Sequence, residues 1–87
     1  MTILLAIDIG NTNVSLGLFD YPTDGAATLS EHWRIGTHSE QTSDETALTV
    51  RALLRQVDRG CEEVTDIVIS SVVPPLLPIW ERASTKL

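Results

Sequence analysis

The feature that most constrains how this chain can fold is an apolar segment that is followed by a carboxylate and a tight turn. Residues 3–9 read Ile-Leu-Leu-Ala-Ile-Asp-Ile, and such a short apolar run predicts a strand buried on both faces. The turn at 10–13 reads Gly-Asn-Thr-Asn, and Gly-Asn accepts the positive backbone φ that tight hairpins require. Branched apolar residues at 14, 16 and 18 then predict a second strand, antiparallel to the first.

A third strand is predicted over residues 29–35, after a segment rich in turn formers at 21–25. Period-two alternation places four residues on one side of this strand, namely Leu29, Glu31, Trp33 and Ile35. A helix should begin at Thr42 or Ser43, because two acidic residues follow, and should stop at Gly60.

Two further segments complete the pattern. Residues 66–73 are rich in β-branched side chains, which predicts a buried strand that Pro74 and Pro75 end. A crossover helix between strands favours parallel pairing for this strand. Apolar residues recur at helical spacing from Leu76 to Leu87 without a stop signal, so we expect the chain to be a fragment of a longer protein.

The predicted order is β-β-β-α-β-α, an α/β chain with an incomplete mixed sheet. Three antiparallel strands followed by a helix and a parallel strand form the opening half of a ribonuclease H-like domain, the unit duplicated in actin, Hsp70 and sugar kinases. By this fold analogy, residues 1–87 are the amino-terminal part of an actin-like ATPase domain. The rest of that domain and a second domain are expected to lie outside the chain.

Composition excludes several classes of function. At 87 residues the chain holds at most one small core. Its formal net charge is −6, and its basic residues are not clustered, so no nucleic-acid partner is expected. No apolar stretch approaches the roughly 20 residues of a membrane span, and no membrane association is expected. Cys61 is the only cysteine, which excludes an internal disulfide, and without an export signal we predict a cytoplasmic protein.

The turn after the first strand carries the predicted chemistry. Asp8 ends an otherwise apolar strand, where burial is costly unless hydrogen bonds or a metal ion compensate. Gly10 lets a ligand approach the backbone, and the N–H groups around Asn11 and Thr12 can form an anion-binding nest. Asp8 can then hold Mg²⁺, directly or through water, and the ion can bridge phosphate oxygens. The simpler alternative is that Asp8 accepts N–H bonds from its own turn.

Three stretches resemble the type III pantothenate kinase family. Asp-Ile-Gly-Asn-Thr-Asn at 8–13, preceded by Leu-Leu-Ala-Ile and followed by Val-Ser-Leu-Gly, resembles the family's first phosphate motif. Trp-Arg-Ile at 33–35 with Thr-Ser-Asp-Glu at 42–45 resembles its third strand and first helix start. Ile-Ser-Ser-Val-Val-Pro at 69–74 resembles its fourth strand and exit. The likeness runs over nearly the whole chain, with the order and spacing preserved.

The resemblance implies an enzyme that transfers the γ-phosphate of ATP to pantothenate, the first step of coenzyme A synthesis. It also implies Mg²⁺ or a similar divalent ion, a monovalent cation such as K⁺ or NH₄⁺, and a homodimer. The ATP phosphates would be bound by Asp8, Ile9, Gly10, Asn11, Thr12, Asn13, Val14 and Ser15. Asp8 would lie near the metal ion, with water between them. Two departures from the family, Gln41 for an Arg and Thr46 for an aromatic residue, lie outside this turn.

The general base of the family is an Asp in a Gly-x-Asp-Arg motif, and this sequence has no such motif. A base must reach the hydroxyl that it activates, so no catalytic residue is expected in this chain and the 87 residues should be inactive alone. Two alternatives stay open. One is another small-molecule kinase of the actin-like superfamily with a different acceptor, and the other is a non-catalytic regulatory protein that binds a nucleotide.

Other polar and aromatic residues are expected to be structural. His32 and His38 lie on different predicted elements, so we expect no shared metal site. Ser70 and Ser71 lack a nucleophile elbow and a partnered base, and we expect structural hydrogen bonds near the strand end. Packing or solvation is expected for Trp33, Trp80, Arg51, Arg55 and Arg59.

Overall fold

The computed structural model describes residues 2–87. They form four strands and two α-helices in the predicted order: β1 (Thr2–Ile9), β2 (Asn13–Tyr21), β3 (Thr28–Gly36), α1 (Ser43–Gln56), β4 (Asp66–Ser71) and α2 (Leu77–Thr85). Two single turns of 3₁₀ helix, η1 (Cys61–Glu63) and η2 (Pro74–Leu76), flank β4. No helix in this part of the chain is long and apolar enough to cross a membrane.

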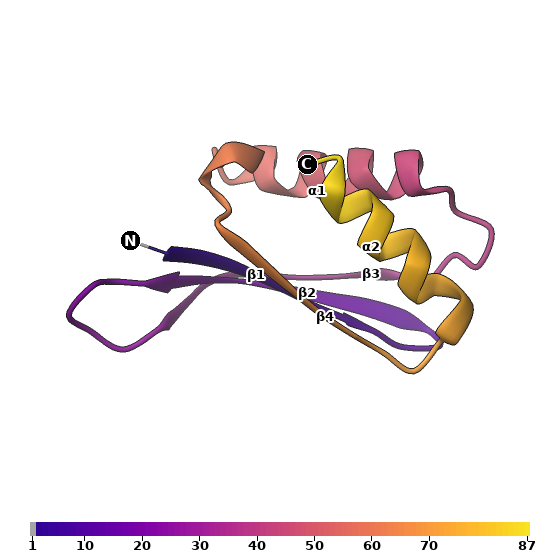
Figure 1. Cartoon of the computed structure of the whole chain (residues 1–87), viewed down its shortest axis with the longest axis horizontal. Coiled ribbons are helices and arrows are strands. Elements are labelled where there is room, and N and C mark those ends of the chain that lie inside the picture. Colours follow the sequence, from indigo (N-terminus) through magenta and orange to yellow (C-terminus); the bar gives the residue numbers. More distant parts are fainter. Residues whose placement is uncertain (1) are drawn as a thin grey trace.

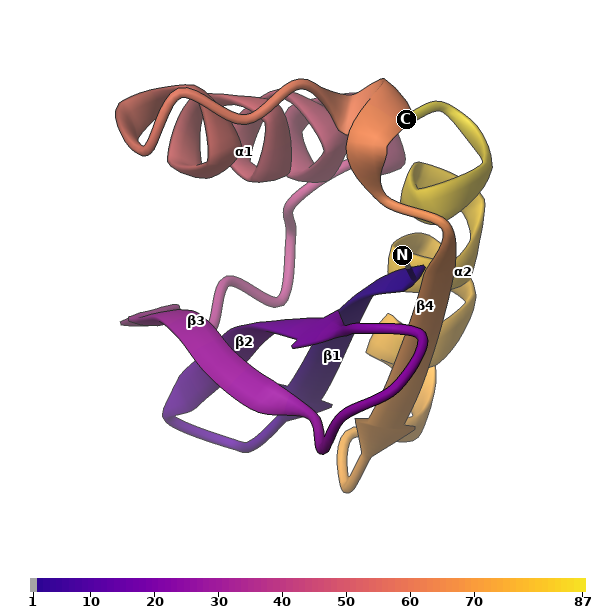
Figure 2. The same cartoon turned by 90° about the vertical axis from the view of Figure 1, so that its left-hand side faces the viewer.

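The strands form one mixed sheet in the order β3-β2-β1-β4. β2 pairs antiparallel with both β1 and β3, and β4 pairs parallel with β1. The crossover through α1 makes this parallel pair possible and confirms the predicted topology. Both helices lie on the same side of the sheet (Figure 1 and Figure 2).

The core lies between the sheet and the helices. It is built from alternate residues of β1 and β2 and from the inner sides of α1 and α2. Its most deeply buried side chains include Leu5, Ile9, Leu16, Leu18, Val50 and Leu54. Trp80 is buried in this core and Trp33 packs against it, which confirms the structural role predicted for both. Each such side chain contributes about 1.5–3 kcal/mol on burial, so this face supplies most of the stability of the chain.

The opposite face of the sheet is open. Leu4 and Ala6 on β1 are only half-buried, and Asp8 is exposed. Within residues 2–87 no helix covers this side (Figure 2). The prediction that β1 is buried on both faces is therefore wrong for the described chain, and the open face carries the residues discussed below.

The position of Leu29 in β3 also differs from the prediction. The register of β3 against β2 shifts between Leu18 and Phe19, so that Glu31 and Leu29 oppose consecutive β2 residues. Such a β-bulge inserts one residue and changes the side to which the strand beyond it points. Leu29 consequently lies on the open face, while Trp33 packs against the core.

α1 begins as predicted but ends early. Thr42 Oγ1 accepts a bond from the N–H of Glu45 (3.1 Å), and Glu45 Oε1 accepts one from the N–H of Thr42 (3.0 Å), which forms a capping box. The last helical residue is Gln56 rather than a residue next to Gly60. Asp58 adopts a left-handed φ of 58°, which the helix cannot continue through.

Arg59 lies beyond the end of α1 and forms ion pairs with Asp20 (3.6 Å) and with Glu63 (3.3 Å). These contacts connect the segment after α1 to the end of β2.

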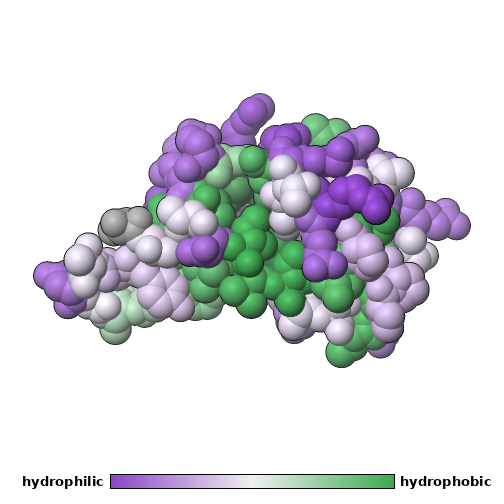
Figure 3. Space-filling view, viewed as in Figure 1, coloured by the Kyte–Doolittle hydropathy of each residue, from purple (hydrophilic) through white to green (hydrophobic). Residues whose placement is uncertain are grey.

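β4 lies at an outer edge of the sheet. It ends at Ser71 rather than at Val73, because the Ser71 hydroxyl accepts from the N–H of Val73 and donates to its carbonyl, both over 3.0 Å. Figure 3 shows apolar side chains gathered on the side of the molecule where β4 meets α2. Apolar open edges favour pairing with other chains, so we expect self-association of the 87-residue chain through this edge.

Candidate phosphate-binding site

The turn between β1 and β2 is held from two sides. The N–H of Gly10 donates to the carbonyl of Asn13 (2.9 Å) and closes the hairpin. Thr37, just after β3, donates its N–H to the carbonyl of Thr12 (2.9 Å) and its hydroxyl to the carbonyl of Gly10 (2.7 Å). The tip of the turn is therefore braced by the end of a third strand.

Gly10 is needed for space rather than for an unusual φ. Among residues 2–87 the only positive φ belongs to Asp58, so the expectation that this turn uses a left-handed residue is wrong. A Cβ atom on Gly10 would lie 2.9 Å from the carbonyl oxygen of Asn13, closer than side chains normally come to the backbone. Only glycine lets the hairpin close in this form.

Two backbone donors at the tip are uncommitted. Asn11 and Thr12 are exposed, and within the described chain neither N–H donates to another backbone or side-chain group. Successive N–H groups that point out of a turn can bind the oxygens of an anion. The amide of Asn11 and the hydroxyl of Thr12 add further donors at the same place.

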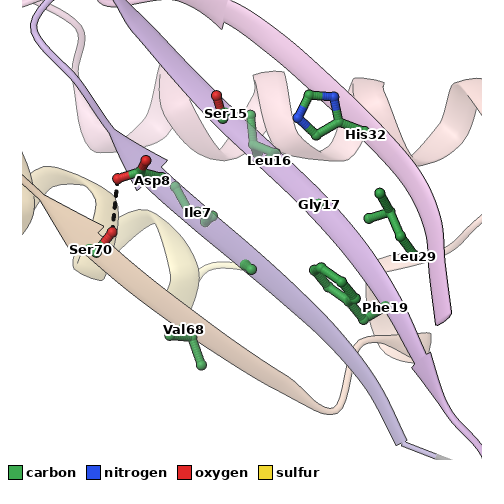
Figure 4. A pocket seen from close by; sticks show the side chains of 11 residues that line it. Ile7, Asp8, Ser15, Leu16, Gly17, Phe19, Leu29, His32, Val68 and Ser70 are labelled. Carbon is green, nitrogen blue, oxygen red and sulfur yellow. Dashed lines mark hydrogen bonds between the residues drawn. The ribbon is translucent and has the colours of Figure 1, made fainter. Parts of the chain in front are cut away.

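Asp8 lies on the open face one residue before the strand ends. Its paired residues are Ser15 on β2 and Ser70 on β4. Ser70 Oγ donates to Asp8 Oδ1 over 2.9 Å (Figure 4). In residues 2–87 no N–H of the turn donates to Asp8, so the alternative that Asp8 caps its own turn is wrong.

A shallow hollow of about 270 Å³ begins at these three side chains and continues along the open face. Asp8, Ser15 and Ser70 form its polar end (Figure 4). Its apolar wall is formed by Ala6, Phe19, Leu29 and Val68, with His32 above Gly17. Asp8, at the polar end of the hollow, is separated from the turn at 10–13 by Ile9 alone.

The donor set fits a hydrated Mg²⁺ ion bound together with phosphates. Among residues 2–87 no group of three or more His, Cys, Asp or Glu side chains comes together. Mg²⁺ in kinases is bound through one or two carboxylates, phosphate oxygens and several waters, and Asp8 offers one exposed carboxylate at this place.

Comparison with known proteins decides the family. The family model described as type III pantothenate kinase matches residues 4–87. The chain belongs to the type III pantothenate kinase family. The type III pantothenate kinase of Exiguobacterium sibiricum is 45% identical over 74 residues, which are 85% of this chain and 27% of that protein. That of Brevibacillus brevis is 43% identical over 83 residues, 95% of this chain and 31% of that protein. The chain thus spans about 30% of the length of the relatives that it matches.

The fold agrees with this membership. The solved structure of diol dehydratase-reactivating factor in nucleotide-free form matches 80% of this chain and 12% of that protein, with a TM-score of 0.64 and 19% identity. That protein has an actin-like ATPase fold, and the likeness confirms the predicted fold class.

In this chain of the pantothenate kinase family the residues of the predicted phosphate segment, 8–15, fall into three groups. Asp8 and Ser15 face the hollow. Ile9 and Val14 are 0% and 1% exposed in the core, so only their backbone atoms are available to a ligand. The remaining members, Gly10 to Asn13, form the turn between them.

Ser70 is the site residue that the sequence did not reveal. It was expected to be structural together with Ser71, and that expectation holds for Ser71, which bonds Val73. Ser70 points to the other side of β4 and contacts Asp8. Strand alternation indicates that neighbouring serines face opposite ways, but only the β1–β4 register shows which one lies beside Asp8.

Proposed function

We propose that the protein carrying this chain transfers the γ-phosphate of ATP to pantothenate, and that residues 8–15 bind the nucleotide phosphates. The observation that carries the proposal is the turn of this family member, in which the uncommitted N–H groups of Asn11 and Thr12 follow exposed Asp8 within four residues. The name of the relatives supports pantothenate as the acceptor.

The turn would contribute preorganised donors. The N–H groups of Asn11 and Thr12 would donate to phosphate oxygens, and the hydroxyl of Ser15 is placed on the same face as Asp8. The bonds from Thr37 hold the turn before any ligand arrives. Donors that are fixed in advance need no reorganisation when charge develops in a reaction.

Asp8 would hold a divalent ion through water. Once bound, the ion would neutralise charge on the transferring phosphoryl group.

In the proposed transfer, the bond between the γ-phosphorus and the oxygen that bridges to the β-phosphate breaks. A bond from the acceptor hydroxyl oxygen to that phosphorus forms, and the hydroxyl proton passes to a base. We propose that residues 1–87 are the amino-terminal part of the kinase domain, and that the base and the acceptor pocket belong to other parts of the protein.

The test is an assay of the native gene product that contains this chain. With MgATP and pantothenate, mass spectrometry should detect 4′-phosphopantothenate, and Asp8→Asn should lower the rate by about 100-fold. Asp24→Asn, in an exposed turn away from the site, is the matched control and should keep the rate. A folded gene product that binds MgATP but leaves pantothenate unchanged would refute the proposal. Transfer to another alcohol in a substrate panel would then favour a different kinase, and binding without any transfer would favour a regulatory protein.

The K⁺ or NH₄⁺ requirement, the homodimer and the cytoplasmic location stay predictions that follow from the family resemblance and the sequence. Assays in K⁺ against Na⁺, and the mass of the native protein in solution, test the first two.

A further inference from the structure

We propose that Ser70 is a positioning residue for Asp8, which holds one oxygen of the carboxylate and leaves the other for the hydrated divalent ion of bound MgATP. This inference rests on the proposed function, because it adds a residue of β4 to the same phosphate site.

The contact joins neighbouring strands at the polar end of the hollow. Asp8 and Ser70 are directly paired in the parallel β1–β4 ladder, and Ser70 Oγ donates to Asp8 Oδ1 over 2.9 Å (Figure 4). Among the side-chain contacts of residues 2–87, no ion pair involves Asp8, and Ser70 is its one hydrogen-bond partner. The second carboxylate oxygen is thus uncommitted in this part of the protein.

The fold gives no structural reason for this hydrogen bond. Asp8 and Ser70 are both exposed, and a hydrogen bond in water gains little because each group can bond to water instead. Ser71, the next residue, is half-buried and forms the local bonds that end β4. Ser71 therefore has a structural role at the end of β4, whereas the hydroxyl of Ser70 contacts the carboxylate of Asp8.

A hydroxyl suits this position chemically. A lysine or arginine beside Asp8 would neutralise the carboxylate and compete with a metal ion, whereas a serine donates one hydrogen and leaves the negative charge in place. Groups that bond to metal-binding carboxylates fix their orientation, and their removal typically lowers metal affinity by about 10- to 100-fold.

The experiment measures metal binding as well as activity. In the full gene product, Ser70→Thr and Ser70→Val form an isosteric pair that differs in the hydroxyl, and Ser71→Ala is the control on the other side of β4. The probe is Mn²⁺ with ADP, followed by the paramagnetic resonance of the ion, and ADP affinity is also measured in EDTA. Thermal unfolding shows whether each variant is folded.

We expect Ser70→Val to weaken Mn²⁺ binding by about 10-fold, Ser70→Thr to keep it near the wild-type value, and metal-free ADP affinity to be equal in both. Combined with Asp8→Asn, Ser70→Val should cause no further loss, because its effect passes through the carboxylate.

Equal Mn²⁺ affinity in the folded Thr and Val variants, or a full further loss in the double variant, would overturn the inference. If Asp8→Asn weakens Mn²⁺ binding and Ser70→Val does not, only the role of Ser70 fails. If wild-type protein binds no Mn²⁺ with ADP, the proposed function fails with it.

Discussion

The two faces of the sheet should respond very differently to the same substitution. Leu18 on β2 is 0% exposed and lies in the core, whereas Leu29 on β3 is 54% exposed on the open face. Leucine to alanine removes three carbons, worth about 2.4 kcal/mol at ~0.8 kcal/mol for each buried methylene. The cavity left in a core raises this cost, so Leu18→Ala should lower the free energy of unfolding by about 2–5 kcal/mol. Leu29→Ala removes less than half as much buried surface and should cost about 1 kcal/mol.

Urea unfolding of the 87-residue chain, followed by the fluorescence of Trp33 and Trp80, measures both values. A difference of about 2 kcal/mol corresponds to roughly 8–16 °C in melting temperature for a domain of this size. Equal losses for Leu18→Ala and Leu29→Ala at low protein concentration would show that the second face is packed and would refute the assignment of an open face. Equal losses only at high concentration would indicate that two chains cover this face together. A wild-type chain without a cooperative transition would contradict the single core.

Three further predictions concern the cap of α1 and the turn. Thr42→Ala should lower the free energy of unfolding by about 1 kcal/mol, while Thr42→Ser keeps the cap, as urea titrations would show. The Thr42 backbone N–H and then its hydroxyl lower the pKa of Glu45 by hydrogen bonding. The stabilisation by Glu45 should be complete above the pH where a free glutamate titrates, about 4.3, and lost as the pH falls through the lower folded pKa. Glu45→Gln should flatten that part of the curve of stability against pH. Gly10→Ala should cost about 1–3 kcal/mol by crowding the carbonyl of Asn13 and should weaken nucleotide binding, whereas Gly36→Ala, with 3.6 Å to its nearest neighbour atom, should change neither.

Local patterns were sufficient for most of the fold. Alternation along residues 14–18 and the helical spacing after Thr42 set the order of the elements, and the capping residues lie within four positions of each other. The exceptions depend on contacts that no short window contains. The bulge that turns Leu29 to the open face arises from how β3 pairs with β2. Asp58 adopts a positive φ and ends α1 before the predicted stop at Gly60. Aspartate has only a weak preference for a positive φ, so the residue type alone does not reveal this end.

The parts of the candidate site were predictable to different extents. Asp8 and the turn after it are contiguous in sequence, so residue types together with the family resemblance suggested a phosphate-binding turn, which stays a proposal. Ser70 is 62 positions away from Asp8, and only strand register brings the two together.

The open face also changes the argument for Asp8 itself. From the sequence, the charge of Asp8 was expected to need a compensating group because its strand looked buried on both sides, yet in the described chain the carboxylate is exposed to solvent.

The open face also carries Ala6, Phe19 and Val68, which are apolar and line the same hollow as Asp8. Any element or ligand that buries these side chains would also remove water from Asp8, and an unpaired carboxylate is costly to desolvate. A divalent ion at Asp8 can offset this cost, together with the hydroxyl of Ser70, so metal binding at Asp8 and closure of the open face should be coupled. The coupling predicts that Phe19→Ala, which lowers the apolar contribution to closure, weakens metal-dependent nucleotide binding without any contact to the phosphates. Unchanged Mn²⁺ affinity in the folded Phe19→Ala gene product would refute it.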